Sequence, residues 1–138
     1  MADVHSKQVR SFNMSRIRSV NTKPEITVRK GLFAAGLRFR LHDKKLPGKP
    51  DIVLRKYKTV VFVHGCFWHG HEGCRYYVIP KTRTEWWQNK INRNKELDSQ
   101  HVKSLKEQGW DVIVIRECEL KQGIAESTLK NLIKKITR

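Results

Sequence analysis

The sequence predicts an α/β domain in which helices flank a short mixed β-sheet. Residues 59–64 and 110–116 carry runs of consecutive apolar, mostly β-branched residues, as buried strands do. Residues near 22–36, 86–105 and 124–136 instead keep apolar side chains at helical spacing. Helices and strands in this order pack as layers around one sheet.

The first predicted helix has recognisable start and stop signals. Thr22 is a suitable N-cap, Pro24 lies in the first turn, and Glu25 stands three residues after the cap, which is the capping-box spacing. Gly36 is typical of the residue at which a helix stops. We therefore expect a helix between these signals.

The segment before this helix differs from the rest of the chain. Residues 1–22 are polar and basic and contain only scattered apolar side chains, too few for a core layer. We expect a flexible basic arm over residues 1–22, which orders on a partner, followed by a single domain over residues 23–138.

Three strands are predicted after the first helix. Residues 39–42 alternate in polarity, and residues 51–54 are mainly apolar and follow a Pro- and Gly-rich loop over residues 46–50. Residues 56–58 form the turn into the strand at 59–64. A long basic helix that ends at Gly109, one more strand and a last helix complete the order.

Charge and composition narrow the range of functions. The 138 residues include 29 Lys and Arg against 13 Asp and Glu, so the formal net charge is +16. Such a charge favours a polyanionic partner, above all nucleic acid, although a merely soluble basic surface is the alternative. Without an apolar run of membrane-spanning length or a secretory signal, we expect a cytoplasmic protein with no membrane contact.

The cysteines predict a metal site. Their number, three, is odd, and a reducing compartment favours metal ligands over disulfides. A Cys₃His set suits tetrahedral zinc with no open position, which is typical of a structural site. The proposed ligands are Cys66, His71, Cys74 and Cys118, with His64 and His69 as competitors for the histidine position. Three unrelated buried thiols are the alternative.

A second set of residues predicts catalysis. Asp51 opens a predicted strand and should lie beside the end of the strand at 59–64. One carboxylate at that place can bind Mg²⁺, although an Asp in this position is more often a turn residue. His64 ends that strand and His69 follows it, and an imidazole can deprotonate a water near neutral pH.

Aromatic residues lie between these two sets. Phe67 and Trp68 come after the core strand has ended, so we expect them to lie outside the core. Apolar side chains of this kind, and Met14 in the basic arm, can enter between base pairs and unstack them. A hydrophobic cap over the zinc site is an equally good interpretation of the two aromatics.

Four motifs give the chain a specific resemblance. They are His-Gly-Cys-Phe-Trp-His at 64–69, Leu-Pro-Gly-Lys-Pro-Asp at 46–51, Arg-Ser-x-Asn-Met at 10–14 and Thr-Arg-Thr-Glu-Trp-Trp at 82–87. From residue 2 to about residue 120 the chain resembles the very short patch repair endonucleases. Those bacterial enzymes nick DNA at T:G mismatches left by deamination of 5-methylcytosine. The resemblance implies a restriction-endonuclease-like core, a structural zinc and a Mg²⁺-dependent active site.

The resemblance also implies roles for individual residues. Asp51 and the main-chain carbonyl of Val63 would bind Mg²⁺, His69 would be the general base, and His64 and Glu25 would support them. The four zinc ligands would be those named above. The DNA-intercalating residues would be Met14, Phe67 and Trp68, and further DNA contacts would come from Arg16, Lys49 and Arg83.

The chain departs from the family pattern at two places. Val63 stands where the family has Thr, and one residue is added between His71 and Cys74. Restriction nucleases commonly carry an acidic residue and a Lys where this chain has Val63 and Gly65, so another base is needed and His69 is available.

The sequence therefore predicts an endonuclease that nicks one strand 5′ of the T in a T:G mismatch, with Mg²⁺ and a structural Zn²⁺. We expect a bacterial, nucleoid-associated monomer that acts on duplex DNA, with mismatch-repair proteins as partners. One alternative is a restriction- or homing-type nuclease of the same fold that needs no mismatch. Another is a non-catalytic zinc module that binds DNA.

Overall fold

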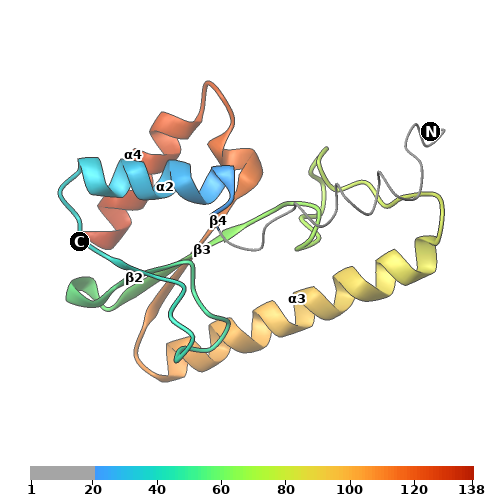
Figure 1. Ribbon diagram of the computed structural model, residues 1–138, viewed down its shortest axis with the longest axis horizontal. Coiled ribbons are helices and arrows are strands. Elements are labelled where there is room, and N and C mark those ends of the chain that lie inside the picture. Colours follow the sequence, from blue (N-terminus) through green and yellow to red (C-terminus); the bar gives the residue numbers. More distant parts are fainter. Residues whose placement is uncertain (1–20) are drawn as a thin grey trace.

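The structure is a computed structural model, and it describes residues 21–138. A four-stranded mixed sheet lies at its centre, in the order β1-β2-β3-β4 (Figure 1). The strands are β1 (Arg40–Leu41), β2 (Ile52–Leu54), β3 (Thr59–His64) and β4 (Asp111–Arg116). The first three pair antiparallel, whereas β3 and β4 pair parallel, so that His64 lies opposite Arg116. The predicted α/β class with a mixed sheet is confirmed.

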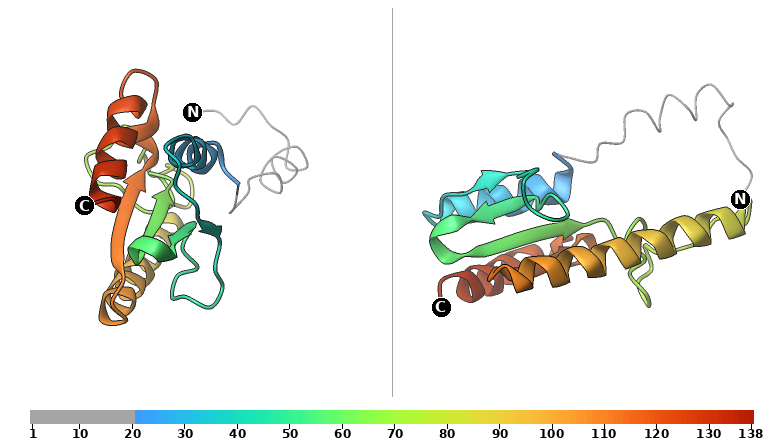
Figure 2. Two further views of the ribbon diagram at one scale, coloured as in Figure 1. Left: turned by 90° about the vertical axis from the view of Figure 1, so that its left-hand side faces the viewer. Right: turned by 90° about the horizontal axis from the view of Figure 1, so that it is seen from below.

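Helices cover both faces of the sheet. Helices α2 (Lys23–Ala34) and α4 (Ala125–Ile136) lie side by side on one face, and α3 (Thr84–Glu107) lies on the other (Figure 2). Side chains alternate along β3, because successive residues of a strand point to opposite faces. Val61 therefore joins the core under α2 and α4, while Val60 and Phe62 pack with Leu105 of α3.

Some boundaries differ from those predicted. The strand expected at 39–42 contains only β1, because His42 has a left-handed backbone (φ +48°) that ends the extended run. Helix α3 begins before Trp86, at Thr84. Two 3-10 helices, η1 (Arg55–Tyr57) and η2 (Glu117–Leu120), were not predicted as helical turns.

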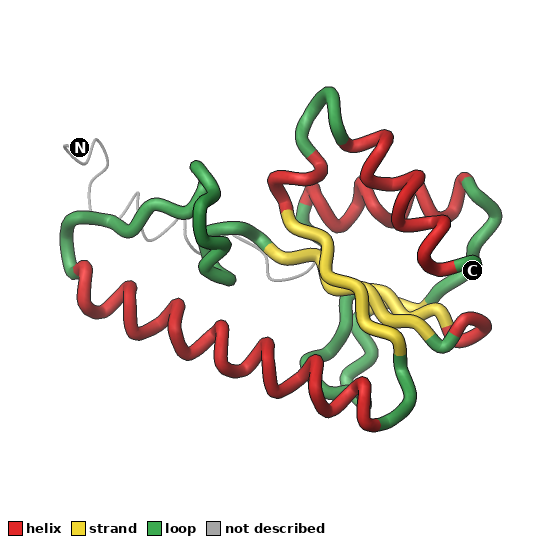
Figure 3. The backbone as a smooth tube through the Cα atoms, turned by 180° about the vertical axis from the view of Figure 1, so that it is seen from behind, coloured by secondary structure: helices red, strands yellow, loops and turns green. Residues whose placement is uncertain are grey.

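Helix α3 is longer than the sheet and continues past the end of β3 (Figure 3). The loop of residues 65–83 runs beside this projecting half. A close approach at Gly70 fixes the loop on the helix, because a Cβ there would lie 2.8 Å from the Ile91 side chain. The Asn94 amide also donates to the Trp68 carbonyl at 2.9 Å. The sequence around Phe67 and Trp68 is thus held against α3.

Within residues 21–138, no helix combines the length and apolar character needed to cross a bilayer. Most of the predicted basic arm, including Met14 and Arg16, lies outside the described residues, and the division of the chain at residue 22 stays a prediction.

Candidate active site and metal centre

Asp51 lies immediately before β2, beside the end of β3. The backbone N–H of Val63 donates to Asp51 Oδ2 at 2.7 Å, which fixes the carboxylate against the neighbouring strand. The predicted second Mg²⁺ ligand, the carbonyl of Val63, thus belongs to a residue that already contacts Asp51 through its amide. Its role as a ligand stays a prediction.

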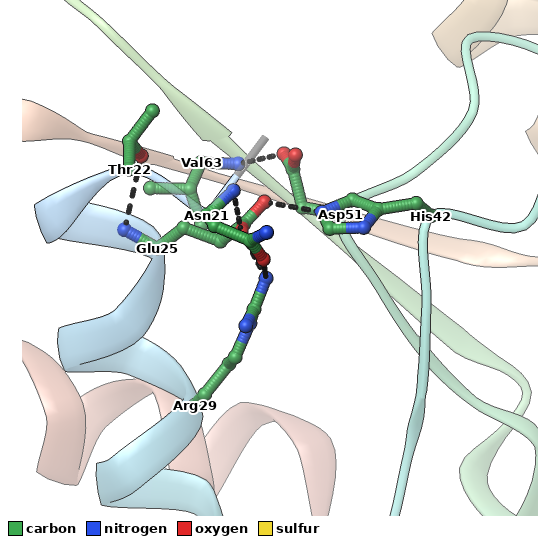
Figure 4. A network of polar contacts seen from close by, with 7 residues as sticks. All are labelled: Asn21, Thr22, Glu25, Arg29, His42, Asp51 and Val63. Carbon is green, nitrogen blue, oxygen red and sulfur yellow. Dashed lines mark hydrogen bonds and ion pairs between the residues drawn. The ribbon is translucent and has the colours of Figure 1, made fainter. Parts of the chain in front are cut away.

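Glu25 reaches the same place from the first turn of α2 and is only 1% exposed. Its Oε1 lies 2.7 Å from His42 Nε2, and its Oε2 accepts from the Asn21 N–H at 2.7 Å and from the Arg29 guanidinium (Figure 4). Thr22 caps the helix as predicted, since its hydroxyl accepts from the Glu25 N–H. The Glu25 side chain does not complete a capping box, because it is turned toward the sheet.

The two carboxylic acids have very different affinities for a proton. Burial and, second, the neighbouring Glu25 raise the pKa of Asp51 to about 7. Burial acts against ionisation of Glu25, but hydrogen bonds from Asp51, His42 and the Asn21 amide outweigh it and lower the pKa of Glu25. Two neighbouring carboxyls of this kind share a proton, and a cation between them would take its place.

We call Glu25, His42 and Asp51 the carboxylate cluster. One ligand atom from each lies within 4.8 Å of the others, a spacing that allows a shared metal ion. Carboxylate oxygens are the donors that Mg²⁺ prefers, and Mg²⁺ usually takes only one or two of them and completes its shell with water and phosphate. The donor set therefore fits a catalytic Mg²⁺.

His64 and His69 stack face to face beside this cluster. Their ring centroids are 3.8 Å apart and their planes differ by 2°. Asp98 of α3 places Oδ2 2.6 Å from His69 Nδ1. An ionised carboxylate only accepts hydrogen bonds, so this contact favours a proton on Nδ1 of His69. The lone pair on Nε2 is then free to accept a second proton. Burial and then His69 lower the pKa of His64 to about 4, which keeps His64 neutral at pH 7.

One cavity of about 180 Å³ lies between Asp51 of the carboxylate cluster and the stacked His64 and His69. Asp51, His64, His69 and Asp98 all line it, and Lys49 lies at its wall. A phosphate in this cavity would meet the Asp51 carboxylate, which suits a cation, an imidazole with a free nitrogen, and the Lys49 ammonium group. That combination is what hydrolysis of a phosphodiester requires.

A second group of donors, which we call the thiol cluster, lies beyond the carboxyl ends of β3 and β4. Cys66 follows β3 by two residues, and Cys118 follows β4 by two residues, so the parallel pairing brings them together. The Cys118 N–H lies 3.4 Å from Cys66 Sγ, and Cys118 Sγ lies 3.5 Å from His71 Nδ1. Ligand atoms of Cys66, His71, Cys74 and Cys118 all lie within 4.8 Å of one another.

The thiol cluster has the composition of a structural zinc site. The structure places His71 among the cysteines, whereas His64 and His69 lie with Asp98 in a separate group. Gly70 and Gly73 have positive φ angles (+59° and +75°) that give the loop its tight turns around His71. Burial raises the pKa of the free Cys66 thiol to about 12, so a cation is needed to hold it as a thiolate.

The predicted intercalating pair belongs to a larger aromatic group. Phe67 packs edge-on against Trp68 at 5.2 Å and against Trp87 of α3 at 5.5 Å between ring centroids. Trp86, which is 45% exposed, packs on Trp87, and the Arg83 guanidinium lies over its ring at 4.8 Å. The first turn of α3 thus supports the two aromatics of the loop.

Comparison with known proteins identifies the family. The model of the family "DNA mismatch endonuclease Vsr" matches residues 2–75. The chain belongs to the Vsr family of DNA mismatch endonucleases. DNA mismatch endonuclease Vsr of Escherichia coli is 46% identical over 121 residues, which cover 88% of this chain and 77% of that protein.

Two further relatives extend over almost the whole chain. Type II nicking enzyme V.NmeAIP of Neisseria meningitidis is 50% identical over 137 residues, covering 99% of this chain and 97% of the relative. Type II nicking enzyme V.XorIIP of Xanthomonas oryzae is 46% identical over 134 residues, covering 96% and 98%. The predicted family, its restriction-endonuclease-like fold and the prediction of a DNA endonuclease are confirmed.

Membership of the Vsr family implies a divalent metal in catalysis, and the carboxylate cluster is the candidate site for that metal.

Sequence reasoning named Asp51 and Glu25 but missed His42, Arg29 and Asp98. Two of these three have no local signature: Asp98 is one charged residue among many in α3, and the polarity alternation at 39–42 gave His42 only a place in a strand. Arg29 has a local signal, because it stands four residues after Glu25, at the spacing of an ion pair along a helix.

Proposed function

We propose that this Vsr-family protein is a Mg²⁺-dependent endonuclease that nicks one DNA strand 5′ of the T in T:G mismatches. The observation that supports it best is the shared cavity. Asp51 on one side and His69 with Asp98 on the other line the same space of about 180 Å³, and Glu25 is the acidic neighbour of Asp51. An acidic pair for the metal and a positioned base are the two parts that the reaction needs.

In the proposed reaction, His69 Nε2 accepts a proton from a water, and the water oxygen bonds to the phosphorus while the bond to the 3′ oxygen breaks. Asp98 orients His69 and stabilises the imidazolium that forms. Asp51, the Val63 carbonyl and Glu25 would hold Mg²⁺, which supplies charge neutralisation at the phosphate and the leaving oxygen. The leaving 3′ oxygen takes a proton from solvent, so the products are a 5′-phosphate and a 3′-hydroxyl, and His69 then returns its proton to solvent. Neutral His64 stacks on His69 and keeps its ring in place.

Zinc is the proposed occupant of the thiol cluster. Three thiolates and one imidazole complete a tetrahedral shell and leave no position for substrate, so the ion would be structural. Cys66, His71 and Cys74 would fix the loop after β3, and Cys118 would tie that loop to β4.

Mismatch selection is proposed to depend on the aromatic group. A T:G wobble pair stacks less well than a Watson–Crick pair, so opening the step beside it costs less free energy. Phe67 and Trp68 lie next to His69 in the sequence and rest on the first turn of α3. Met14 would reach the same step from the basic arm, and Arg16, Lys49 and Arg83 would contact the phosphates.

The test is a nicking assay on a pair of duplexes that differ only in T:G against T:A, each with and without Mg²⁺. We expect a nick 5′ of the T in the T:G duplex with Mg²⁺ only. The double variant Phe67→Ala, Trp68→Ala should keep zinc and non-specific DNA binding and lose most of the preference for T:G. Equal nicking of both duplexes by the unchanged protein would instead favour a restriction-type nuclease.

Binding to DNA should depend strongly on salt. With a net charge of +16 and roughly six to ten phosphates neutralised, affinity should fall by about 10³ to 10⁵ between 50 and 200 mM salt. A nearly flat response would contradict the DNA assignment. We propose that the protein acts as a monomer at the bacterial nucleoid, with mismatch-repair proteins as partners.

A further inference from the structure

We propose that His42 is a positioning residue that holds the two catalytic carboxylates in a fixed mutual arrangement. Its backbone N–H donates to the carbonyl of Asp51 at 3.2 Å, and its side-chain Nε2 lies 2.7 Å from Glu25 Oε1. One residue is therefore bonded to the main chain of the first carboxylate residue and to the side chain of the second. This inference rests on the proposed role of Asp51 as a metal ligand.

The backbone of His42 is arranged for this contact. β1 ends at Leu41, and His42 has φ +48°, in the left-handed region that residues other than Gly adopt at a cost in free energy. Because the backbone turns there, the chain leaves the strand and enters the loop toward Asp51. The imidazole is largely buried, with 18% of its side chain exposed, against a Glu25 side chain that is 2% exposed.

The remaining contacts of Glu25 show what His42 contributes. Oε2 of Glu25 already has two donors, the Asn21 N–H and the Arg29 guanidinium, whereas Oε1 faces His42 (Figure 4). Loss of the imidazole would leave a buried carboxylate oxygen without this donor, which is costly. Glu25 would then rotate or take up a proton, and in both cases it would present less negative charge to a cation at Asp51.

The contact between His42 and Glu25 also indicates that His42 acts on the metal ion indirectly. A neutral imidazole that donates from Nε2 to Glu25 has no lone pair on that nitrogen for a metal ion. His42 therefore acts on the cation through Glu25 and is not itself a ligand. Changes in groups that orient metal-binding side chains typically lower metal affinity or activity by about 10- to 100-fold.

Three variants test the proposal in the full chain. His42→Ala removes the donor, His42→Gln restores a donor at nearly the Nε2 position, and Leu41→Ala is a control at the neighbouring, partly exposed residue of β1. We measure single-turnover nicking of a T:G duplex against Mg²⁺ concentration, Mn²⁺ binding by electron paramagnetic resonance in the absence of DNA, and DNA binding without added Mg²⁺ or Mn²⁺.

In His42→Ala, the Mg²⁺ concentration for half-maximal rate and the Mn²⁺ dissociation constant should rise by about 10- to 100-fold, while DNA binding is unchanged. His42→Gln should recover most of both losses, and Leu41→Ala should behave as the unchanged protein. Wild-type metal dependence in His42→Ala would overturn the proposal. So would a His42→Gln variant as impaired as His42→Ala, since a direct ligand would then be indicated.

The role of Asp51 is tested separately. If Asp51→Asn nicks at the wild-type rate, the proposed active site fails, whatever His42 does. If Asp51→Asn is inactive and His42→Ala keeps wild-type metal dependence, the proposed function stands and the role of His42 is refuted.

Discussion

The carboxylate cluster and the thiol cluster lie near the same end of β3 but are built in different ways. The thiol cluster takes three ligands from one nine-residue stretch, Cys66 to Cys74, and one from the end of the adjacent parallel strand. The carboxylate cluster takes one residue each from α2, the end of β1 and the start of β2. A closed coordination shell of soft donors suits a structural metal ion, whereas hard donors beside a cavity suit a catalytic metal ion.

The largest difference between the clusters should appear in Asp51→Asn. The change removes the negative charge that would hold the catalytic cation, so nicking in Mg²⁺ should fall by roughly 10⁴-fold, or about 5 kcal/mol in the barrier. Zinc content and mismatch binding should be unchanged, because the thiol cluster is a separate group of residues. Single-turnover nicking and metal analysis of the same preparation check this. Loss of zinc in this variant would show that the clusters are not independent.

Cys118→Ser should have the opposite profile. It breaks the connection between the loop after β3 and the end of β4, so zinc should be released and the free energy of unfolding should fall by about 4 kcal/mol. Calorimetry and zinc analysis measure both effects. A variant that keeps one zinc per chain would mean that another residue, with His69 or His64 first to be examined, completes the shell.

Asp98→Asn probes the histidine pair that lies between the clusters. An amide can donate as well as accept, so His69 Nδ1 would no longer be held in one protonation state, and the nicking rate should fall by about 10- to 100-fold. The exposed Glu96→Gln on the same helix is the matched control for the loss of one negative charge. Equal rates in the two variants would remove Asp98 from the mechanism.

The smallest expected effect is on the pH dependence of the free energy of unfolding, measured in the absence of Mg²⁺. The pKa of Asp51 is raised from 3.8 to about 7 in the folded protein, so the folded state holds this proton more tightly than the unfolded state. The free energy of unfolding should therefore fall as the pH rises from about 4 to about 7. Asp51→Asn should lack this loss and be more stable than wild type at pH 8, on the order of 1–2 kcal/mol, but not at pH 3. Thermal melts of zinc-loaded protein across this range are the measurement.

Sequence patterns predicted the elements whose signals are local. The strand at 59–64 has the predicted bounds, and the parallel position of β4 brings Cys118 to Cys66 as expected from its place after a buried strand. Of the three residues in the carboxylate cluster, Asp51 and Glu25 were predicted and His42 was not. The contact of His42 with Glu25 joins residues 17 positions apart through a left-handed backbone, and no propensity or spacing indicates such a contact.

The Glu25 position shows how a correct local pattern can hide a functional group. Its spacing from Thr22 predicts a capping box, and the Thr22 half of that box is present. Burial against the sheet instead directs the carboxylate to His42 and Arg29, so tertiary contacts override the local motif. The same holds for α3, where Asp98 acquires a role only because the loop carrying His69 lies against the helix.

The parallel pairing of β3 with β4 has a consequence for the order of folding. Cys66 and Cys118 are separated by 52 positions, and contacts between such distant segments form slowly because closing a long loop is entropically costly. Cys66, His71 and Cys74 are close enough in the chain to capture zinc while β4 is still being synthesised. Arrival of Cys118 would then lock a 52-residue loop, as a disulfide of that span does, with a gain of about 4 kcal/mol. Zinc would thus guide the last strand into register, and refolding should be slower when zinc is withheld.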